Sequence, residues 1–218
     1  MFGLNDFKKG SHEANSLNKG GLFYKLARAL FSIFFCVFFR WKIYGRENIP
    51  SEGVYIICSN HINWFDPPLV GCAVRTGTQV CFMAKGELFN IPVFNYLIKK
   101  LGAFPVRRYK ADRQAIRHAL NTLNERKSLG LFPEGSRSKT GELQKPYHGP
   151  SLIIIRGGEP VIPVAIKGPY RLFRPIKINI GAPIYFASRD KSNKITRNEV
   201  REVSHKVMEE IKKLKDEI

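Results

Sequence analysis

From about Gly45 onward, short apolar runs alternate with segments in which apolar residues recur every three or four positions. Runs of this length between polar or turn-forming residues are typical of β-strands. They predict strands over Val54–Ser59, Val80–Ala84, Leu129–Phe132, Val161–Ile166 and Ile176–Ile180.

Two segments have the periodicity of amphipathic helices. Within Ala111–Lys127, one helical face collects Ala115, Ile116, Ala119, Leu120 and Leu123. Near the C-terminus, Thr196 and Glu199 form a capping box, and the apolar positions that follow at helical spacing are Val200, Val203, Val207, Ile211 and Leu214. Strands that alternate with helices predict an α/β fold, with a mixed, largely parallel sheet flanked by helices.

The N-terminal part of the chain divides into two segments of different character. Residues 1–21 are polar, contain Gly and Asn and lack periodicity, so they predict a flexible tail. Residues 22–42 read LFYKLARALFSIFFCVFFRWK and hold six of the chain's sixteen phenylalanines. Charges flank both ends of this predicted helix and no small-residue cleavage site follows, which excludes a cleavable signal peptide.

The length of the apolar stretch bears on how this helix would meet a membrane. A spanning helix needs about 20 apolar residues, whereas the uninterrupted apolar stretch, Ala29–Phe39, has eleven. Lys25, Arg28 and Ser32 fall on one helical stripe. The pattern therefore favours a helix in the membrane interface with its phenylalanines towards the lipid. A single spanning helix and a core helix of the soluble domain are the alternatives.

The charge balance narrows the class of partner. The net charge is +18 and the pI about 10.0, which favours an anionic partner: a membrane surface, a phosphorylated substrate or a nucleic acid. No recognisable nucleic-acid-binding motif occurs, and such a role leaves the phenylalanine-rich segment unexplained, so we expect no nucleic-acid partner. The chain also has no Cys-x-x-Cys spacing, so neither a metal nor a redox site is predicted for Cys36, Cys58, Cys72 and Cys81.

His61 and Asp66 are the first candidates for chemistry. They lie five positions apart in ICSNHINWFDPPLV, and two prolines follow the aspartate, so we expect Asp66 to cap the next helix. His61 then lies in the loop after the strand Val54–Ser59, at the edge where open α/β sheets bind ligands. There the carboxylate could orient the imidazole and leave its other nitrogen free as a general base. The alternative is a satisfied loop histidine beside a helix cap.

The sequence offers this histidine no obvious protein nucleophile. There is no Gly-x-Ser-x-Gly elbow, and none of the cysteines lies in a marked electropositive turn. The hydroxyl that such a base activates would then belong to the substrate. This predicts direct transfer, without a covalent enzyme intermediate.

Two further stretches combine basic residues with turns. In LFPEGSRSKTGE, Leu131–Glu142, a glycine-containing turn gathers polar side chains around Arg137. A guanidinium in that position could bind a phosphate through two hydrogen bonds, although a solvated charged turn is the alternative. The stretch KGELFNIPVFNYLIKKLGAFPVRR, Lys85–Arg108, reads as a strand end, a helix and a loop that finishes in two arginines.

Four of these stretches together resemble a known family. In order, NHINWFD, KGELFNIPVF…LGAFPVRR, FPEGSRS and VIPVAI resemble the four sequence blocks of the glycerolipid acyltransferases, most closely the 1-acylglycerol-3-phosphate (lysophosphatidic acid) acyltransferases. The resemblance runs from about Ile43 to Ile184, and four ordered blocks are far more specific than the His–Asp spacing alone. It implies that residues 43–218 form an acyltransferase catalytic domain. A membrane-interface helical segment over residues 22–42, a helix or helix pair, would precede it.

The resemblance implies roles for particular residues. His61 would be the general base, and Asp66 its orienting partner. The third block would bind the glycerol phosphate through Glu134, Gly135, Ser136 and Arg137.

The second block would add a phosphate contact from Arg108. The position before that arginine is often acidic in the family but is Arg107 here, so either arginine could be the ligand. Lys85 opens the block near the site, and stabilisation of the tetrahedral oxyanion is one hypothesis for it. The last block would be a strand beside the site, shaped by Pro163.

The activity that the resemblance implies is transfer of a fatty acyl group from an acyl thioester to the free hydroxyl of lysophosphatidic acid, giving phosphatidic acid in phospholipid synthesis. Acyl-CoA or acyl-acyl carrier protein would be the co-substrate, and no metal or other cofactor is expected. We expect a monotopic or peripheral enzyme at the cytoplasmic face of the cell membrane. The alternatives are another lysolipid or glycerol 3-phosphate as acceptor, and a non-catalytic membrane-binding module.

Overall fold

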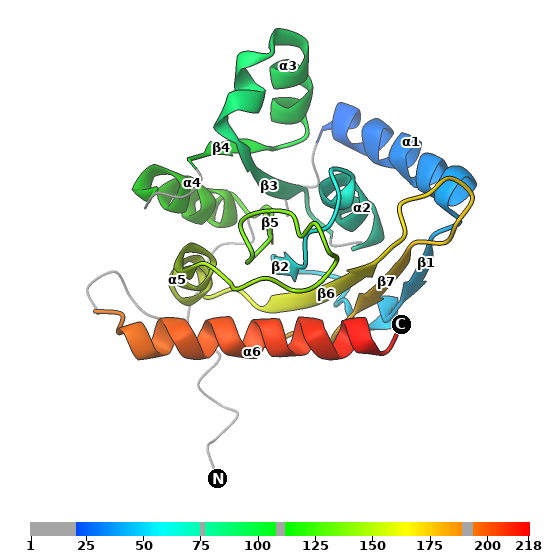
Figure 1. Cartoon of the computed structure of the whole chain (residues 1–218). Helices are drawn as coiled ribbons and strands as arrows, with labels where there is room; N and C mark the ends of the chain where they lie inside the picture. Colours follow the sequence, from blue (N-terminus) through cyan, green and yellow to red (C-terminus); the bar gives the residue numbers. More distant parts are fainter. Residues whose placement is uncertain (1–20, 75–76, 108–111, 189–193) are drawn as a thin grey trace.

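A seven-stranded sheet forms the centre of the protein (Figure 1). The computed structural model describes residues 21–74, 77–107, 112–188 and 194–218. Within them the strand order is β1-β7-β6-β2-β5-β3-β4; β7 is antiparallel to β6, and every other neighbouring pair is parallel. The expected mixed, largely parallel sheet is therefore confirmed. The strands are β1 (Lys42–Tyr44), β2 (Ile56–Ser59), β3 (Val80–Lys85), β4 (Phe104–Val106), β5 (Ser128–Leu131), β6 (Val161–Lys167) and β7 (Lys177–Ile180).

Helices cover both faces of this sheet. Successive residues of β2 point to opposite faces, so Ile56 and Cys58 lie in one core and Ile57 in the other. The first core is closed by α4 (Arg113–Asn124), α5 (His148–Gly157) and α6 (Arg197–Asp216), and the second by α1 (Leu22–Phe39) and α2 (Asp66–Ala73). The remaining helical segments are η1 (Arg46–Asn48), η2 (Gly86–Asn90) and α3 (Pro92–Lys100).

The elements with strong local signals form where the sequence predicts them. All five predicted strands are present with ends shifted by up to two residues, and α4 lies within its predicted segment, the first residue of which is outside the described ranges. The capping box of α6 is confirmed: Thr196 Oγ1 accepts from the Glu199 N–H at 3.2 Å, and the Glu199 carboxylate accepts from the Thr196 N–H at 2.8 Å.

Two short strands carry no such signal and were not predicted. β1 and β4 have three residues each, and they form the two ends of the sheet. β1 is set by parallel pairing with β7, 135 positions later in the chain for Lys42 and Lys177. Because β1 starts at Lys42, the helical part of residues 22–42 ends at Phe39, and Arg40 closes it in the left-handed conformation.

The orientation of α1 differs from the expected one. We expected its phenylalanines to face lipid, but Phe35 and Phe39 are buried in the core, and the rings of Phe31 and Phe34 pack against it. The helix is apolar on more than one face, so periodicity alone did not decide which face turns inward. The outward row consists of Leu22, Leu26, Leu30, Ile33 and Val37, each more than half exposed.

Within the described residues, α1 is one helix that is long and apolar enough to cross a membrane, judged by length and composition. Its contacts with α2 and with the sheet side of the core show that one face is already occupied by protein. The expected tail, residues 1–21, and any second helix in it lie outside the described residues except for Gly21.

Candidate active site

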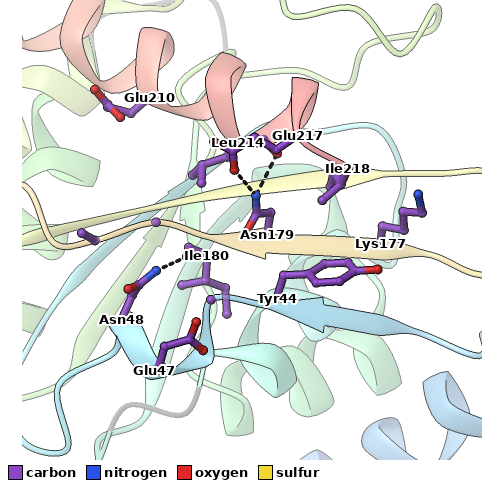
Figure 2. Close-up of a pocket in the computed structure, with 13 residues that line it drawn as sticks. Tyr44, Glu47, Asn48, Lys177, Asn179, Ile180, Glu210, Leu214, Glu217 and Ile218 are labelled. Atoms are coloured by element: carbon purple, nitrogen blue, oxygen red, sulfur yellow. Dashed lines mark hydrogen bonds between the residues drawn. The ribbon is translucent and has the colours of Figure 1, made fainter.

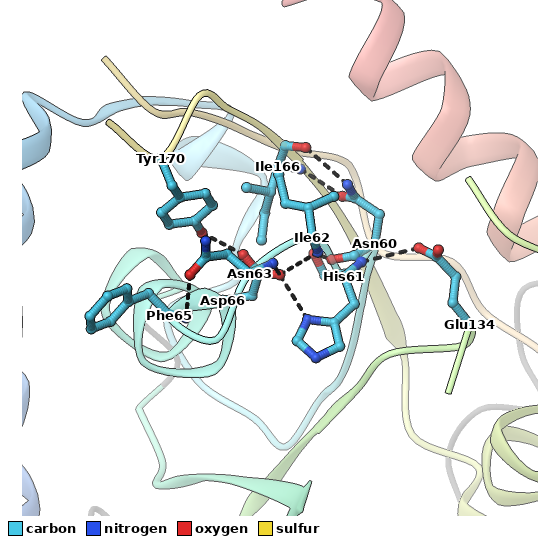
Figure 3. Close-up of polar contacts among 10 residues, drawn as sticks. Asn60, His61, Ile62, Asn63, Phe65, Asp66, Glu134, Ile166 and Tyr170 are labelled. Atoms are coloured by element: carbon cyan, nitrogen blue, oxygen red, sulfur yellow. Dashed lines mark hydrogen bonds and ion pairs between the residues drawn. The ribbon is translucent and has the colours of Figure 1, made fainter. Parts of the chain in front are cut away.

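His61 and Asp66 meet at the carboxyl edge of the sheet, where the sequence places them. β2 ends at Ser59, and the loop that follows carries His61 before α2 begins at Asp66. The ring nitrogen Nδ1 of His61 lies 2.7 Å from Oδ2 of Asp66 (Figure 3). Both side chains are nearly removed from solvent, with 8% of the histidine and none of the aspartate side chain exposed. A buried carboxylate in this position fixes the ring and its tautomer.

Asp66 does not cap α2, which corrects the expectation from its position before the two prolines. No side-chain cap bond is present at the start of this helix, and the residue in the cap position is Phe65. The carboxylate turns back instead and accepts the backbone N–H groups of Ile62 and Asn63 at 2.6 and 2.7 Å. It therefore closes the loop that carries His61, so the interpretation of Asp66 as a helix cap is wrong.

Tyr170 is a contact of Asp66 that sequence reasoning missed. Its hydroxyl donates to Oδ1 of Asp66 (Figure 3), and its ring packs on Phe39 of α1 with the centroids 5.9 Å apart. Burial, reinforced by the Asp66 charge, raises the pKa of Tyr170 well above its ordinary value, so the phenol keeps the proton that it donates. Tyr170 lies 104 positions from Asp66 in a loop after β6, and no local pattern marks it.

Asn60 attaches the same loop to the neighbouring strand. Its side-chain amide donates to the Ile166 carbonyl at 2.9 Å, and its oxygen accepts from the Ile166 N–H at 2.7 Å. These two bonds mimic one step of a β-ladder between the end of β2 and β6. The residue before His61 is thereby held in place, although no sequence pattern distinguished it from the rest of NHINWFD.

The loop after β5 forms the other wall of the site. The Phe132 ring stacks on the His61 ring with centroids 4.1 Å apart. Glu134 is 1% exposed and accepts the N–H of His61 at 3.0 Å through Oε1 and the N–H of Gln144 at 3.0 Å through Oε2. Burial raises the pKa of Glu134, and these two N–H donors offset part of that rise. Both oxygens thus already have donors from the protein itself.

The turn Gly135–Arg137 brings a guanidinium beside this loop. Gly135 has φ +66°, and a Cβ there would come within 2.8 Å of the Tyr147 ring, so both conformation and space require glycine. Ser136 Oγ donates to Gln144 at 3.2 Å. The guanidinium carbon of Arg137 lies 3.8 Å from the centroid of the Trp64 ring. Trp64 belongs to the loop that carries His61, between His61 and Asp66 in the sequence.

The backbone also joins the two loops. The Ser138 N–H donates to the carbonyl of His61 at 2.7 Å, next to the bond from the His61 N–H to Glu134. His61, Asp66, Glu134 and Arg137 are therefore brought together by contacts that link the first and third sequence blocks.

Lys85 and Arg107 of the second block lie further along the same edge. Lys85 ends β3, and its ammonium lies 3.2 Å from the Glu87 carboxylate. Arg107 follows β4 with an exposed side chain, and its N–H donates to Asp112 at 2.8 Å. Arg108 lies outside the described residues. In the part of the chain that the structure describes, the polar contacts of Lys85 and Arg107 are therefore with Glu87 and Asp112 and not with His61.

Within the described residues, the buried cysteines are poor candidates for a nucleophile that His61 could activate. Cys58, Cys72 and Cys81 are buried, and burial raises the pKa of Cys81 to about 11. Such thiols are poor nucleophiles at neutral pH. In the same ranges no group of three or more His, Cys, Asp or Glu side chains is placed to hold a metal ion.

A pocket lies away from His61, between β1, β7 and the C-terminal end of α6 (Figure 2). Its polar groups bind one another: Asn179 donates to the Leu214 carbonyl at 3.1 Å and to Glu217 at 2.7 Å, and Asn48 donates to the Ile180 carbonyl at 2.8 Å. This arrangement closes the sheet onto α6 and brings together no acid–base pair, so the His61 loop is the better candidate for chemistry.

Comparison with known proteins identifies the family of the chain. Residues 40–167 match the family model described as Acyltransferase. The chain is 32% identical over 151 residues to the 1-acyl-sn-glycerol-3-phosphate acyltransferase of Bacillus subtilis (strain 168), which covers 67% of this chain and 74% of that protein. It is 29% identical over 209 residues to the enzyme of the same name from Streptococcus pneumoniae (strain ATCC BAA-255 / R6), covering 90% of this chain and 74% of that one.

A solved structure gives the same answer for the fold. The crystal structure of the 1-acyl-sn-glycerophosphate (LPA) acyltransferase PlsC from Thermotoga maritima matches with a TM-score of 0.64 and 28% identity, over 88% of this chain and 78% of that chain. The family resemblance of the four sequence blocks is therefore confirmed. Because the family model matches more than half of the chain, the chain belongs to the Acyltransferase family and is an acyltransferase.

Proposed function

We propose that the chain transfers a fatty acyl group from an acyl thioester to the free hydroxyl of lysophosphatidic acid, giving phosphatidic acid. The observation that carries the proposal is the buried His61–Asp66 pair, joined through Glu134 and Ser138 to the loop that presents Arg137. The names of the bacterial relatives, 1-acyl-sn-glycerol-3-phosphate acyltransferase, favour this acceptor over glycerol 3-phosphate.

The hydrogen bond between His61 and Asp66 supports His61 as a general base. When Asp66 accepts the Nδ1 proton of His61, the lone pair lies on Nε2, which can take the proton of the acceptor hydroxyl. The hydroxyl oxygen then bonds to the thioester carbonyl carbon, the carbon–sulfur bond breaks, and the proton passes from Nε2 to the leaving thiolate, which becomes the free thiol. Asp66, held by four donors, stabilises the imidazolium that forms in between.

Arg137 is the proposed ligand of the acceptor's phosphate. A phosphate monoester carries about −1.5 to −2 charges, and a guanidinium can bind two of its oxygens at once. Stacking on Trp64 holds the Arg137 plane beside the histidine loop while leaving its N–H edge for a ligand. Both oxygens of Glu134 accept backbone N–H groups, so we assign this carboxylate the task of joining the two loops rather than of binding an anion.

The location proposed for the enzyme is the surface of a membrane. Phe35 and Phe39 hold α1 on the core, while Leu26, Leu30 and Ile33 are exposed on its other side. A helix packed on its own protein along one face can offer only the opposite face to lipid, which supports a monotopic arrangement rather than a crossing. Thioester donors are cytoplasmic, so we place the site at the cytoplasmic face.

A product assay tests the proposal. Purified chain is given lysophosphatidic acid, another lysophospholipid or glycerol 3-phosphate, each with acyl-CoA and with acyl-acyl carrier protein, and the products are identified by mass. We expect phosphatidic acid from lysophosphatidic acid with at least one donor, and the comparison identifies that donor. Product from one of the other acceptors alone would replace the proposed acceptor.

The role of His61 is tested by substitution. His61→Ala should lower kcat by about 10²–10⁴-fold, the usual contribution of a general base, and leave the thermal unfolding transition in place. His205→Ala, on the exposed face of α6, is the matched control and should keep full activity. No acylated protein should accumulate from labelled donor alone. Nearly full activity in His61→Ala, or a stable acyl-enzyme, would contradict the mechanism.

A further inference from the structure

α3 packs less against the rest of the protein than the other α-helices that the structure describes. It has nine residues, Pro92–Lys100, and contributes no buried residue to either core. In Figure 1 it projects from the body of the molecule beyond β3 and β4. Isolated helices shorter than about 12–15 residues are marginal in water, and proteins normally stabilise them by burying an apolar face. A short helix with no buried face therefore calls for a partner beyond the described fold.

The exposed side chains of this region are largely apolar. Isolated exposed apolar residues are ordinary, but a contiguous group of them marks an interaction surface. The group here, named the α3 patch, lies within about two helical turns. Its residues have these exposed fractions: Ile91 53%, Val93 74%, Phe94 42%, Tyr96 60% and Leu97 39%.

The chemistry around the α3 patch fits an anionic lipid surface. From Ile91 to Lys100 there is no acidic residue, and the helix ends in Lys99 and Lys100. The Lys100 ammonium lies 5.6 Å from the centroid of the Tyr96 ring. Aromatic rings and lysines with apolar stems are the residues that lie at the boundary between lipid and water.

The position of α3 relative to the site points to the same partner. α1 leads into β1 at one end of the sheet, α3 connects β3 to β4 at the other end, and β2 with its His61 loop lies between them. η2 and α3 follow β3 at the carboxyl edge, the edge at which the His61 loop follows the parallel strand β2. In Figure 1, α3 and α1 both lie at the end of the molecule opposite α6.

We propose that α3 is a second bilayer contact, in which the α3 patch inserts into an anionic lipid surface on the far side of the catalytic loop from α1. Two contacts, one on each side of His61, would fix the orientation of the site relative to the membrane. A lipid acceptor could then enter the site directly from the bilayer. The inference rests on the membrane location proposed for α1, but not on the identity of the acceptor.

The insertion can be measured directly with a fluorescent probe. The full chain carries Val93→Cys in a Cys36→Ala background, which leaves only buried native cysteines, and is labelled with an environment-sensitive fluorophore. On vesicles of phosphatidylcholine and phosphatidylglycerol we expect a blue shift, and quenching by lipids with nitroxide-labelled acyl chains. The control probe is Tyr185→Cys: this residue is 62% exposed and follows Ile184, which pairs with Val161 at the amino-terminal edge of the sheet. An unquenched probe at position 93 would overturn the proposal.

Substitution then tests what the contact does. Val93→Ser/Tyr96→Ser should weaken binding to the same vesicles by about tenfold or more, because two large apolar groups no longer enter the lipid. Turnover of a short-chain, water-soluble acceptor should stay unchanged. Tyr185→Ser, which removes an equally exposed ring from the opposite edge, should change neither.

Other partners for the α3 patch would give different results. Unchanged vesicle binding with a raised KM for acyl-acyl carrier protein would assign the patch to the donor protein, and loss of a dimer in sedimentation would assign it to a second copy; either outcome overturns the lipid contact. The proposed function fails separately: if the wild-type chain acylates none of the acceptors while the probe at position 93 is still quenched, the lipid contact stands and the activity does not.

Discussion

At the scale of single residues, the stacking of Arg137 on Trp64 leads to a test of acceptor recognition. Arg137→Ala should raise the KM for lysophosphatidic acid by roughly 10- to 150-fold, because a hydrogen bond to a charged group contributes about 1.5–3 kcal/mol. The donor KM should hardly change. Arg137→Lys should recover only part of the loss, since an ammonium cannot bind two oxygens in the same plane. Steady-state kinetics in each substrate measures the two values.

Two companion variants separate charge from position. Trp64→Ala should raise the acceptor KM by less than Arg137→Ala, and should add little when the two are combined, because Trp64 acts through the arginine that it holds. Lys139→Ala, an exposed cation of the same turn, is the control for general loss of positive charge. A rise confined to the donor KM would move Arg137 to the donor's phosphate instead.

The buried carboxyl of Glu134 predicts a pH dependence of stability. Burial raises its pKa, so the folded protein binds this proton more tightly than the unfolded chain. The Glu134 contribution to the free energy of unfolding is therefore fully present below the unfolded pKa and declines as pH rises through the higher, folded pKa. The difference in unfolding free energy between wild type and Glu134→Gln should fall with pH in that window and stay level above it.

Chemical denaturation at a series of pH values measures this difference. Glu142→Gln is a suitable control, because that side chain lies on the same loop and is 83% exposed. Its difference from wild type should show no comparable slope. A rise with pH for Glu134 would mean that the N–H groups of His61 and Gln144 outweigh burial.

At the scale of elements, α1 has two apolar faces with different tasks. Phe35 is fully buried, with its ring among those of Phe34, Trp41 and Phe65, so Phe35→Ala should lower the free energy of unfolding by about 3–5 kcal/mol. Ile33, two positions away, is 62% exposed. Ile33→Ala should change the unfolding free energy by less than about 0.5 kcal/mol but weaken binding to vesicles.

Denaturation and vesicle sedimentation on the same two variants check this division. Equal loss of stability in both would mean that α1 is covered by protein on its outer face as well. Equal retention of vesicle binding would remove α1 from the membrane contact and leave that role to other parts of the surface.

At the scale of the whole molecule, the net charge of +18 predicts how membrane binding responds to salt. Each basic residue close to an anionic surface contributes about 1 kcal/mol, and this attraction is screened as the Debye length shrinks. Binding to vesicles that contain phosphatidylglycerol should weaken several-fold between about 0.05 and 0.5 M salt. The contribution of the α1 outer face should persist, because burial of apolar surface does not depend on charge.

Vesicle sedimentation across this salt range, with phosphatidylcholine alone as reference, measures both parts. Complete release at high salt would leave electrostatic attraction as the whole of the membrane affinity. Binding to phosphatidylcholine that equals binding to the anionic vesicles would mean that the charge serves another partner, such as an acidic carrier protein.

The sequence by itself determined the elements with local signals and the order of the chemical groups. The strands Val54–Ser59 and Val161–Ile166 and the capping box at Thr196 depend on residues within a few positions of one another, so pattern was enough. The same holds for His61, whose place after a strand follows from the alternation around it. The four ordered sequence blocks also identified the family, because they combine several such local features.

Only the tertiary structure decided which of several locally reasonable contacts each group makes. Asp66 had the pattern of a helix cap, but the N–H groups of its own loop and the hydroxyl of Tyr170, 104 positions away, bind it instead. Glu134 accepts the N–H of His61, 73 positions away, and no local pattern marks that contact. For the same reason, the sequence alone did not determine which side of α1 faces the core. A helix that is apolar on two faces gains from burying either one, and the shape of the sheet beneath it decides which is buried.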